Sequence, residues 1–136
     1  MNRNKIIANG EEQIFTIPVN KISQNKKINE HYISSQWSTK LIRSIQHNYQ
    51  KSPYFEEYSI HLFSLIKELE DKNFSDACVL IFETIADILN ITSKWHLSSS
   101  FGVEHLKAEQ KIITICNELD ADMYINPIGG LDLDFY

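Results

Sequence analysis

The chain has 136 residues, of which 43% are hydrophobic and 23% are charged, and its formal net charge is −5. That length and that apolar fraction are typical of one domain with a packed core, so we expect residues 1–136 to form a single domain. The acidic balance excludes a general nucleic-acid binder, which needs a basic surface to neutralise phosphates.

Hydropathy, cysteine usage and the placement of charge indicate where the protein is located and what kind of ligand it could bind. No apolar run approaches the roughly 20 residues that span a bilayer, and the N-terminus is polar, so we expect a cytoplasmic protein without a membrane span. Cys78 and Cys116 lie in apolar helical patterns and suit core packing better than a disulfide. Basic side chains gather in the first 51 residues, which could therefore face an anionic ligand: Arg3, Lys5, Lys21, Lys26, Lys27, Lys40, Arg43 and Lys51.

The chain begins with a predicted hairpin. Residues 13–19 alternate in the sequence QIFTIPV, which indicates a strand, and Pro18 places that strand at an edge or at its own end. Asn9-Gly10 before it is a hairpin signal, so residues 4–8 are the expected partner strand. Residues 26–33 are a further candidate for a short strand.

Two amphipathic helices should follow, separated by a tight corner. Trp37, Leu41, Ile45 and Tyr49 recur every four residues, which predicts a helix that Ser34 or Ser35 caps. The next helix should start at Pro53, because proline suits the first helical position, and an apolar stripe continues to about residue 70.

The second half reads as helix, strand, helix, strand. Residues 76–89 are apolar around most of their circumference and predict a central core helix, with Ser75 as its cap. Strands are expected over residues 91–99 and 123–126, with a helix over residues 103–119 between them. This order favours an α/β fold with parallel pairing, a small sheet and four to five helices in all.

The histidine spacing gives little support to a metal site or to a catalytic histidine. No two of the five histidines have the i, i+4 spacing of a helical metal pair, so we expect no metal site. His47 lies near the corner and could act as a general base. A surface histidine near a helix end is the stronger interpretation, because no orienting partner is evident.

Two polar turns follow the predicted strands of the second half. Ser98, Ser99 and Ser100 could hold a phosphate or carboxylate with help from the next helix dipole, or Ser100 could simply cap that helix. The stretch from Asn126 to Gly130 contains two glycines that permit close backbone approach to a ligand, although a plain turn is the stronger interpretation.

Several stretches in fixed order carry a family resemblance. They are NRNKI, a strand ending in IPV, then NYQKSPYF, LSSSFG and IITICNELDADMYINPIGG. In combination they resemble the WbqC-like protein family over nearly the whole chain. The resemblance implies substrate-binding roles for a set of motif positions: Asn2, Arg3, Asn4, Tyr49, Lys51, Tyr54, Ser98, Ser99, Asn126, Gly129 and Gly130.

The resemblance also implies a function, and it shows where this chain departs from the family pattern. WbqC-like proteins are encoded among bacterial genes for surface polysaccharides such as the O-antigen of lipopolysaccharide, and they are described as transferases acting on amino sugars. The family pattern starts earlier, with a strand carrying a QPxYxPxxGY-like motif, and continues differently after the two glycines. We therefore expect either a relative that is truncated at the N-terminus and also at the C-terminus, or a fragment of a longer protein.

Two functions follow as expectations. The first is group transfer to a sugar or amino sugar in surface-polysaccharide biosynthesis, with an anionic small molecule such as a nucleotide sugar as substrate, and with activity that truncation could have removed. Arg3 and Lys51 would bind the anionic group, but no catalytic residue and no cofactor is identified. The alternative is a non-catalytic interaction module that forms a homodimer through an uncovered sheet edge.

Overall fold

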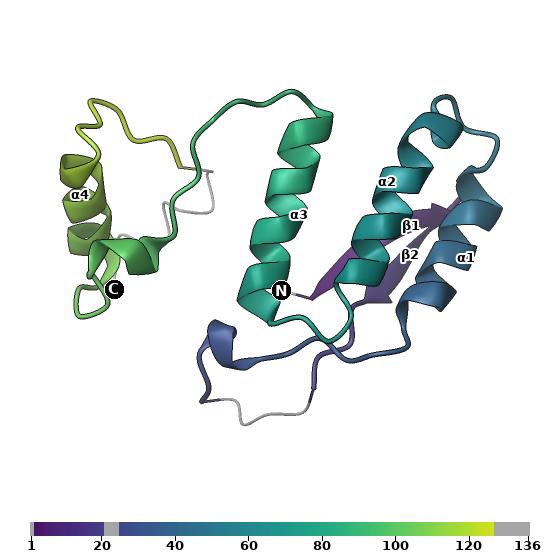
Figure 1. Cartoon of the computed structure of the whole chain (residues 1–136), viewed down its shortest axis with the longest axis horizontal. Coiled ribbons are helices and arrows are strands. Elements are labelled where there is room, and N and C mark those ends of the chain that lie inside the picture. Colours follow the sequence, from purple (N-terminus) through teal and green to yellow (C-terminus); the bar gives the residue numbers. More distant parts are fainter. Residues whose placement is uncertain (1, 21–24, 127–136) are drawn as a thin grey trace. The chain divides into compact units, whose positions relative to one another are not determined.

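The structure is a computed structural model that describes residues 2–20 and 25–126. The chain divides into two compact units, Met1–Thr92 and Ser93–Tyr136, and each is described by itself. The family motifs are spread over both units. Residues 2–20 and 25–92 contain the hairpin and the first three α-helices (Figure 1).

The first unit opens with the predicted hairpin. Strand β1 (Arg3–Ala8) pairs antiparallel with strand β2 (Glu11–Thr16), and Ala8 lies opposite Glu11. Asn9 and Gly10 connect the strands with φ values of 54° and 82°. Positive φ at both turn residues defines a type I′ turn, whose twist matches that of the strands. The hairpin prediction is therefore confirmed, and Pro18 lies just beyond the end of β2.

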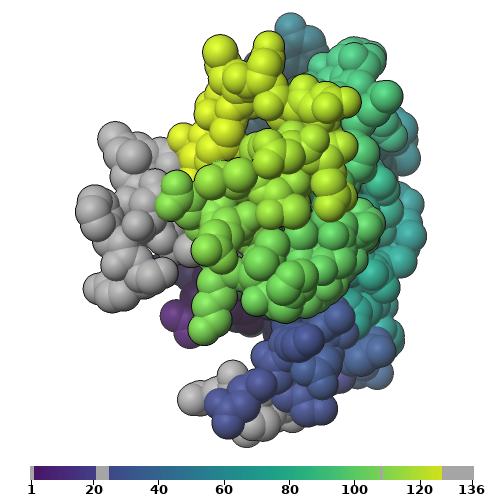
Figure 2. All heavy atoms as spheres, turned by 90° about the vertical axis from the view of Figure 1, so that its left-hand side faces the viewer, coloured from purple at the N-terminus to yellow at the C-terminus, as the bar shows by residue number. Residues whose placement is uncertain are grey.

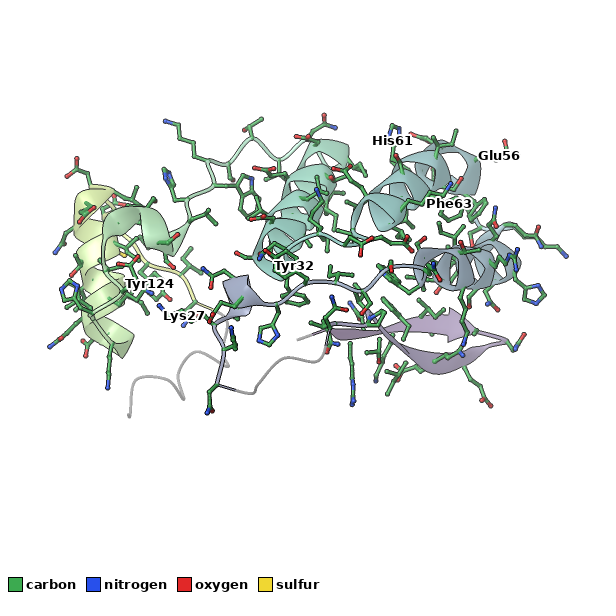
Figure 3. All side chains as sticks on the ribbon, turned by 60° about the horizontal axis from the view of Figure 1, so that its bottom comes forward. Lys27, Tyr32, Glu56, His61, Phe63 and Tyr124 are labelled. Carbon is green, nitrogen blue, oxygen red and sulfur yellow. The ribbon has the colours of Figure 1, made fainter. Side chains whose placement is uncertain are left out.

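Three helices form a second layer in this unit. They are α1 (Ser38–Tyr49), α2 (Phe55–Glu68) and α3 (Phe74–Ile88). Figure 3 shows α1 lying above one face of the hairpin. The core cluster of the unit consists of four buried side chains: Ile33, Leu65, Leu69 and Ala77. Helix α3 supplies only part of this core. Its residues Phe82 and Ile85 are 57% and 45% exposed, so the helix is buried on one side rather than on several as predicted.

The strand predicted over residues 26–33 does not form. Its middle is the 3₁₀-helix η1 (Ile28–Glu30), because the Glu30 carboxylate accepts the Lys27 N–H at 2.8 Å and closes a local turn. Only single bridges follow, one between Val19 and Ile33 and one between Tyr32 and Asn73. These bridges hold Ile33 in the core, where 1% of its surface is exposed.

Both predicted helix caps are wrong. Helix α1 begins after Trp37, and the Ser38 N–H donates to the carboxylate of Glu70, 32 residues later, at 2.9 Å. Helix α3 is capped by Asn73, whose Oδ1 accepts the N–H of Ser75 at 2.9 Å. Asn73 precedes the predicted cap by two positions, and asparagine is as good a cap as serine.

The contact between Glu70 and α1 yields a stability prediction. Glu70→Ala should lower the melting temperature by about 2 to 6 °C, because the first N–H groups of α1 lose their only side-chain acceptor among the described residues. Glu68→Ala is the control on the same helix end, since Glu68 makes only an exposed ion pair with Lys72. Equal melting temperatures for the two variants would contradict this assignment.

The same contact makes stability depend on pH. The Ser38 N–H lowers the pKa of Glu70 below its ordinary value of 4.5 on folding. The unfolded chain therefore takes up the proton first, so this stabilisation is present above about pH 4.5 and disappears as the pH falls through the lowered pKa. Thermal melts of Glu70→Ala should depend less on pH in this acid range than those of the Glu68→Ala control.

The second unit contains the 3₁₀-helix η2 (Ser98–Phe101) and helix α4 (Ala108–Glu118), shown in green to yellow in Figure 2. The predicted strands over residues 91–99 and 123–126 are absent, and so is their parallel pairing. Among the described residues, β1 and β2 make the whole sheet. An extended segment becomes a strand only when a neighbour supplies hydrogen bonds, and no strand in the described part of the chain pairs with these segments.

Helix α4 starts five residues later than predicted. The Leu106 N–H donates to the Val103 carbonyl at 3.1 Å, which makes a separate turn before the helix. Over the described ranges the chain has a two-stranded sheet and four α-helices, so a small α/β fold with an N-terminal hairpin and four helices is confirmed, whereas the helix-strand-helix-strand second half is wrong. No helix within those ranges is both long enough and apolar enough to cross a membrane.

Candidate functional site

The corner between α1 and α2 differs from its prediction in one important way. The Ser52 N–H donates to the Tyr49 carbonyl at 2.8 Å and the Phe55 N–H to the Ser52 carbonyl at 3.3 Å, which makes two successive turns. Helix α2 therefore begins at Phe55, and Pro53 lies in the turn instead of at the first helical position. The residue that delays the helix is Tyr54, whose φ of 63° lies in the left-handed region.

Tyr54 is strained and exposed at the same time. A left-handed conformation costs a non-glycine residue about 1 to 2 kcal/mol. The Tyr54 side chain is 72% exposed, so burial of its ring does not offset that cost. Backbone strain of this kind is concentrated at ligand and active sites, which makes the corner the candidate functional site of the first unit.

An apolar pocket of about 300 Å³ lies against this corner, and we call it the corner pocket. Four aromatic side chains and Pro53 form much of its wall. Its complete lining is Ile6, Ile45, Tyr49, Ser52, Pro53, Tyr54, Phe55, Tyr58, Ser59 and Leu62. Phe55 is also in edge-on contact with Phe63, at 6.1 Å between ring centroids, which supports the pocket wall from α2.

A polar pocket of about 360 Å³ adjoins the corner pocket. Its lining is Gln50, Lys51, Ser52, Tyr54, Phe55, Glu56 and Glu57. Ser52, Tyr54 and Phe55 line both pockets, so the corner offers an apolar and a polar surface side by side. The polar pocket holds one cation and two carboxylates, so it suits a ligand with hydroxyl or amino groups as well as an anionic group.

The Glu57 carboxylate affects Tyr58, one of the aromatic residues in the wall of the corner pocket. A hydrogen bond to the Glu57 carboxylate raises the pKa of the Tyr58 hydroxyl, and the negative charge of Glu57 adds to this effect. Tyr58 therefore keeps its proton and is a hydrogen-bond donor rather than a base. Figure 3 shows Glu56 and His61 pointing away from the hairpin, in agreement with the exposed surface position of His61.

Tyr49 joins the hairpin to the corner. Its hydroxyl accepts the Ile7 N–H at 2.7 Å, and Asn48 accepts the Asn9 N–H at 3.1 Å. These two bonds attach the outer edge of β1 to the end of α1 and bring Ile6 into the pocket wall. The contacts join residues about forty positions apart, so the sequence carried no local signal for them.

The three remaining predicted residues of this unit lie elsewhere on the hairpin. The Asn2 side chain donates to the Ile17 carbonyl at 2.8 Å, and Asn4 accepts the N–H of Lys5 at 2.8 Å. Arg3 is exposed at the start of β1. Ile7 is the β1 residue that contacts Tyr49, and about 17 Å of extended chain separates it from Asn2. The segment from Asn2 to Asn4 is therefore not brought to the corner with the other predicted residues of this unit.

The other predicted residues belong to the second unit. Ser98 and Ser99 are exposed in η2, and Asn126 is exposed in a segment without regular structure. Because α4 begins at Ala108, its N-terminus does not follow the serines directly as expected. Ser100 donates its hydroxyl to the Leu97 carbonyl at 2.7 Å within η2, so it does not cap α4. Gly129 and Gly130 lie outside the described residues.

Other candidate chemistry is sparse where the structure describes the chain. No group of three histidine, cysteine or acidic side chains within residues 2–20 and 25–126 could hold a metal ion. Both cysteines are free thiols, and burial raises the pKa of Cys78. His47 is exposed on α1, which agrees with its interpretation as a surface residue.

The corner carries the motif NYQKSPYF, and this motif lies within the part of the chain that matches a known family. The model of the WbqC-like protein family matches residues 1–134. The chain belongs to the WbqC-like protein family. The match spans both units of this WbqC-like chain, which agrees with the resemblance of its motifs. No curated protein and no solved structure matches it.

Proposed function

We propose that this WbqC-like protein binds a sugar or amino sugar at the corner and serves group transfer in bacterial surface-polysaccharide biosynthesis. The observation that carries the proposal is the exposed, strained Tyr54 between an apolar and a polar pocket. Family membership supports the sugar as the class of substrate, and the pockets suggest how it would be held.

A sugar ring has an apolar face of C–H groups and a rim of hydroxyls. Tyr54 and Tyr58 offer aromatic surface on which the apolar face of the ring could lie. Gln50, Glu56 and Glu57 offer acceptors for hydroxyl groups on the rim. Small-molecule sites combine apolar walls with a few placed polar groups in this way.

The charges of the polar pocket suggest the rest of the substrate. Lys51 could pair with a phosphate of a nucleotide-linked sugar, while Glu56 and Glu57 would attract an amino group on the ring. An unsubstituted anion is a poor ligand here, because the two carboxylates oppose it. A nucleotide-linked amino sugar satisfies both signs of charge, so we propose it as the substrate class.

Thermal stability measured with a panel of nucleotide-linked sugars tests this proposal. A donor at ten times its Kd should raise the free energy of unfolding by about 1.4 kcal/mol. Lys51→Ala should weaken that donor about tenfold, while Lys67→Ala, an exposed lysine on α2 outside both pockets, should not. No shift with any donor at millimolar concentration, or equal binding by the Lys51→Ala variant, would refute the proposal.

A further inference from the structure

The two edges of the hairpin are treated differently by the fold. Residues that exchange ladder hydrogen bonds alternate along an antiparallel pair. The Ile17 N–H donates to the Asn2 carbonyl at 2.9 Å, and Ala8 pairs with Glu11 at the turn, so Gln13 and Phe15 bond to β1. The backbone groups that point away from β1 belong to the alternate residues of β2: Glu12, Ile14 and Thr16.

The outer edge of β1 is partly covered, and that of β2 is open. On β1, the outward Ile7 N–H donates to the hydroxyl of Tyr49 and the outward Lys5 N–H donates to the side chain of Asn4. On β2, none of the described residues makes a hydrogen bond to the outward groups of Glu12, Ile14 or Thr16. The middle of this edge is apolar, because Ile14 is 64% exposed. Open edges of this kind are templates for pairing with another strand.

A groove lies beside the open edge. It has a volume of about 520 Å³ and runs between β2 and the first half of α1. Its lining is Ile6, Gln13, Ile14, Phe15, Thr16, Pro18, Gln36, Trp37, Lys40, Leu41 and Ser44. The groove is therefore on the α1 side of the hairpin, the side that Phe15 faces, and it could receive a side chain from a strand added to the edge.

We propose that two copies of this chain pair through their β2 edges, antiparallel and centred on Ile14. In this register Ile14 lies opposite Ile14 of the second copy, and Glu12 lies opposite Thr16. All three outward residues of each strand then exchange hydrogen bonds, which gives six bonds about one two-fold axis. Pro18 has no N–H to donate, so it limits the pairing to this short stretch.

Charge favours a second copy as the occupant. The register keeps the two Glu12 carboxylates apart, and each carboxylate lies beside the Arg3–Thr16 pair of the other copy. Along the central row of the resulting sheet, the two Ile14 side chains meet and a lysine, Lys5, lies outside each of them. Cross-strand apolar contacts and opposite charges both stabilise such rows, and no like charges face each other directly.

Shape favours it as well. A two-fold axis perpendicular to the sheet keeps both α1 helices on the same side of the four-stranded sheet. Phe15 of the second copy then lies opposite Gln13, on the groove side, where the apolar lining of Trp37 and Leu41 could bury its ring. The contact is short, so we expect a dimer of micromolar affinity rather than an obligate one.

Cysteine cross-linking tests the register directly. In a full-length background with Cys78→Ser and Cys116→Ser, Ile14→Cys should form a disulfide-linked dimer under mild oxidation, because opposite Cα atoms in such a pair lie about 5.5 Å apart. Glu12→Cys is the control, because its two copies would be about 14 Å apart and could not join. Efficient linkage of Glu12→Cys, or none of Ile14→Cys, would overturn the register.

Sedimentation tests the dimer without any cysteine. The wild-type chain should shift from monomer to dimer across the micromolar range, and Ile14→Glu should raise the dissociation constant at least tenfold. In the monomer the new carboxylate faces Lys5 across the hairpin, so the fold is kept, whereas two such carboxylates face each other in the dimer. Ile7→Thr, on the same exposed face but on β1, should still dimerise.

Two results of sedimentation would overturn the proposal: a wild-type chain that stays monomeric at every concentration, and a dimer that survives Ile14→Glu. A third contrary result would come from a separate titration, in which a monomer captures an added extended peptide on the edge. The inference does not depend on the sugar site, because sedimentation is measured without ligand. A failed donor titration therefore leaves it intact.

Discussion

Replacing Leu65 by alanine should lower the free energy of unfolding by about 2 to 5 kcal/mol, as expected for the loss of a large side chain from the core. Leu65 is 7% exposed and belongs to the core cluster with Ile33, Leu69 and Ala77. Its truncation removes buried apolar surface and leaves a cavity that the surrounding helices fill only in part. Denaturant unfolding of the full chain measures the loss.

Ile60→Ala is the matched control for Leu65→Ala. Ile60 lies on the same helix, α2, but is 73% exposed. Alanine has a higher helix propensity than isoleucine, so this variant should change stability by no more than about 0.5 kcal/mol in either direction. Similar losses in both variants would mean that α2 does not bury the face assigned to it.

Replacing Tyr54 by glycine should have opposite effects on stability and on binding. Glycine adopts the φ of 63° without strain, and little ring burial is lost, so the free energy of unfolding should rise by about 1 kcal/mol. The aromatic surface shared by the two pockets disappears, so the Kd for a nucleotide-linked sugar should rise at least about tenfold. Thermal melts with and without ligand give both quantities.

Gln36→Gly is the control that distinguishes the effect of relieving backbone strain from the effect of removing the Tyr54 ring. Gln36 has the same φ of 63° and also stands just before a helix, but it lines the groove beside β2 and not the corner. This variant should be as stable as the wild type or more stable, and it should bind the sugar equally well. A loss of binding in Gln36→Gly, or full binding in Tyr54→Gly, would contradict the role of the Tyr54 ring.

Local rules were sufficient for the hairpin and for the phases of the first helices. The Asn9-Gly10 turn has one favourable conformation. The alternation of residues 13–19 fits a strand after that turn, and the turn brings the preceding residues beside it as the second strand. The four-residue repeat from Trp37 to Tyr49 predicted α1, and it holds from Ser38 to Tyr49. These features depend on neighbours within a few positions, which a sequence displays directly.

Local rules failed where a distant partner was required or absent. Residues 91–99 and 123–126 have strand-like composition, but composition does not reveal whether a second strand is present to pair with them. Helix boundaries failed for the same reason. Glu70 takes the Ser38 N–H from another helix end, and no serine next to α1 was needed to cap it.

The candidate site was found in part. The motif NYQKSPYF located Tyr49, Lys51 and Tyr54, which the structure gathers at one corner. The left-handed backbone of Tyr54 was not foreseen, because proline at position 53 favoured an immediate helix start. Glu56 and Glu57 were not among the predicted site residues, and their place in the polar pocket adds acceptors for the proposed sugar.

The amino-acid sequence by itself determined the hairpin with its turn, the amphipathic faces of α1 and α2, and the aromatic composition of the corner, because these depend on backbone preferences and spacing over a few residues. Only the tertiary structure decided that the Tyr49 hydroxyl accepts the outward Ile7 N–H of β1, that Glu70 caps α1, and that the edge of β2 stays open in the described chain. Each of these depends on which groups meet across about thirty to forty residues. A hydrogen bond requires a partner within about 3 Å, and only the folded chain supplies that proximity.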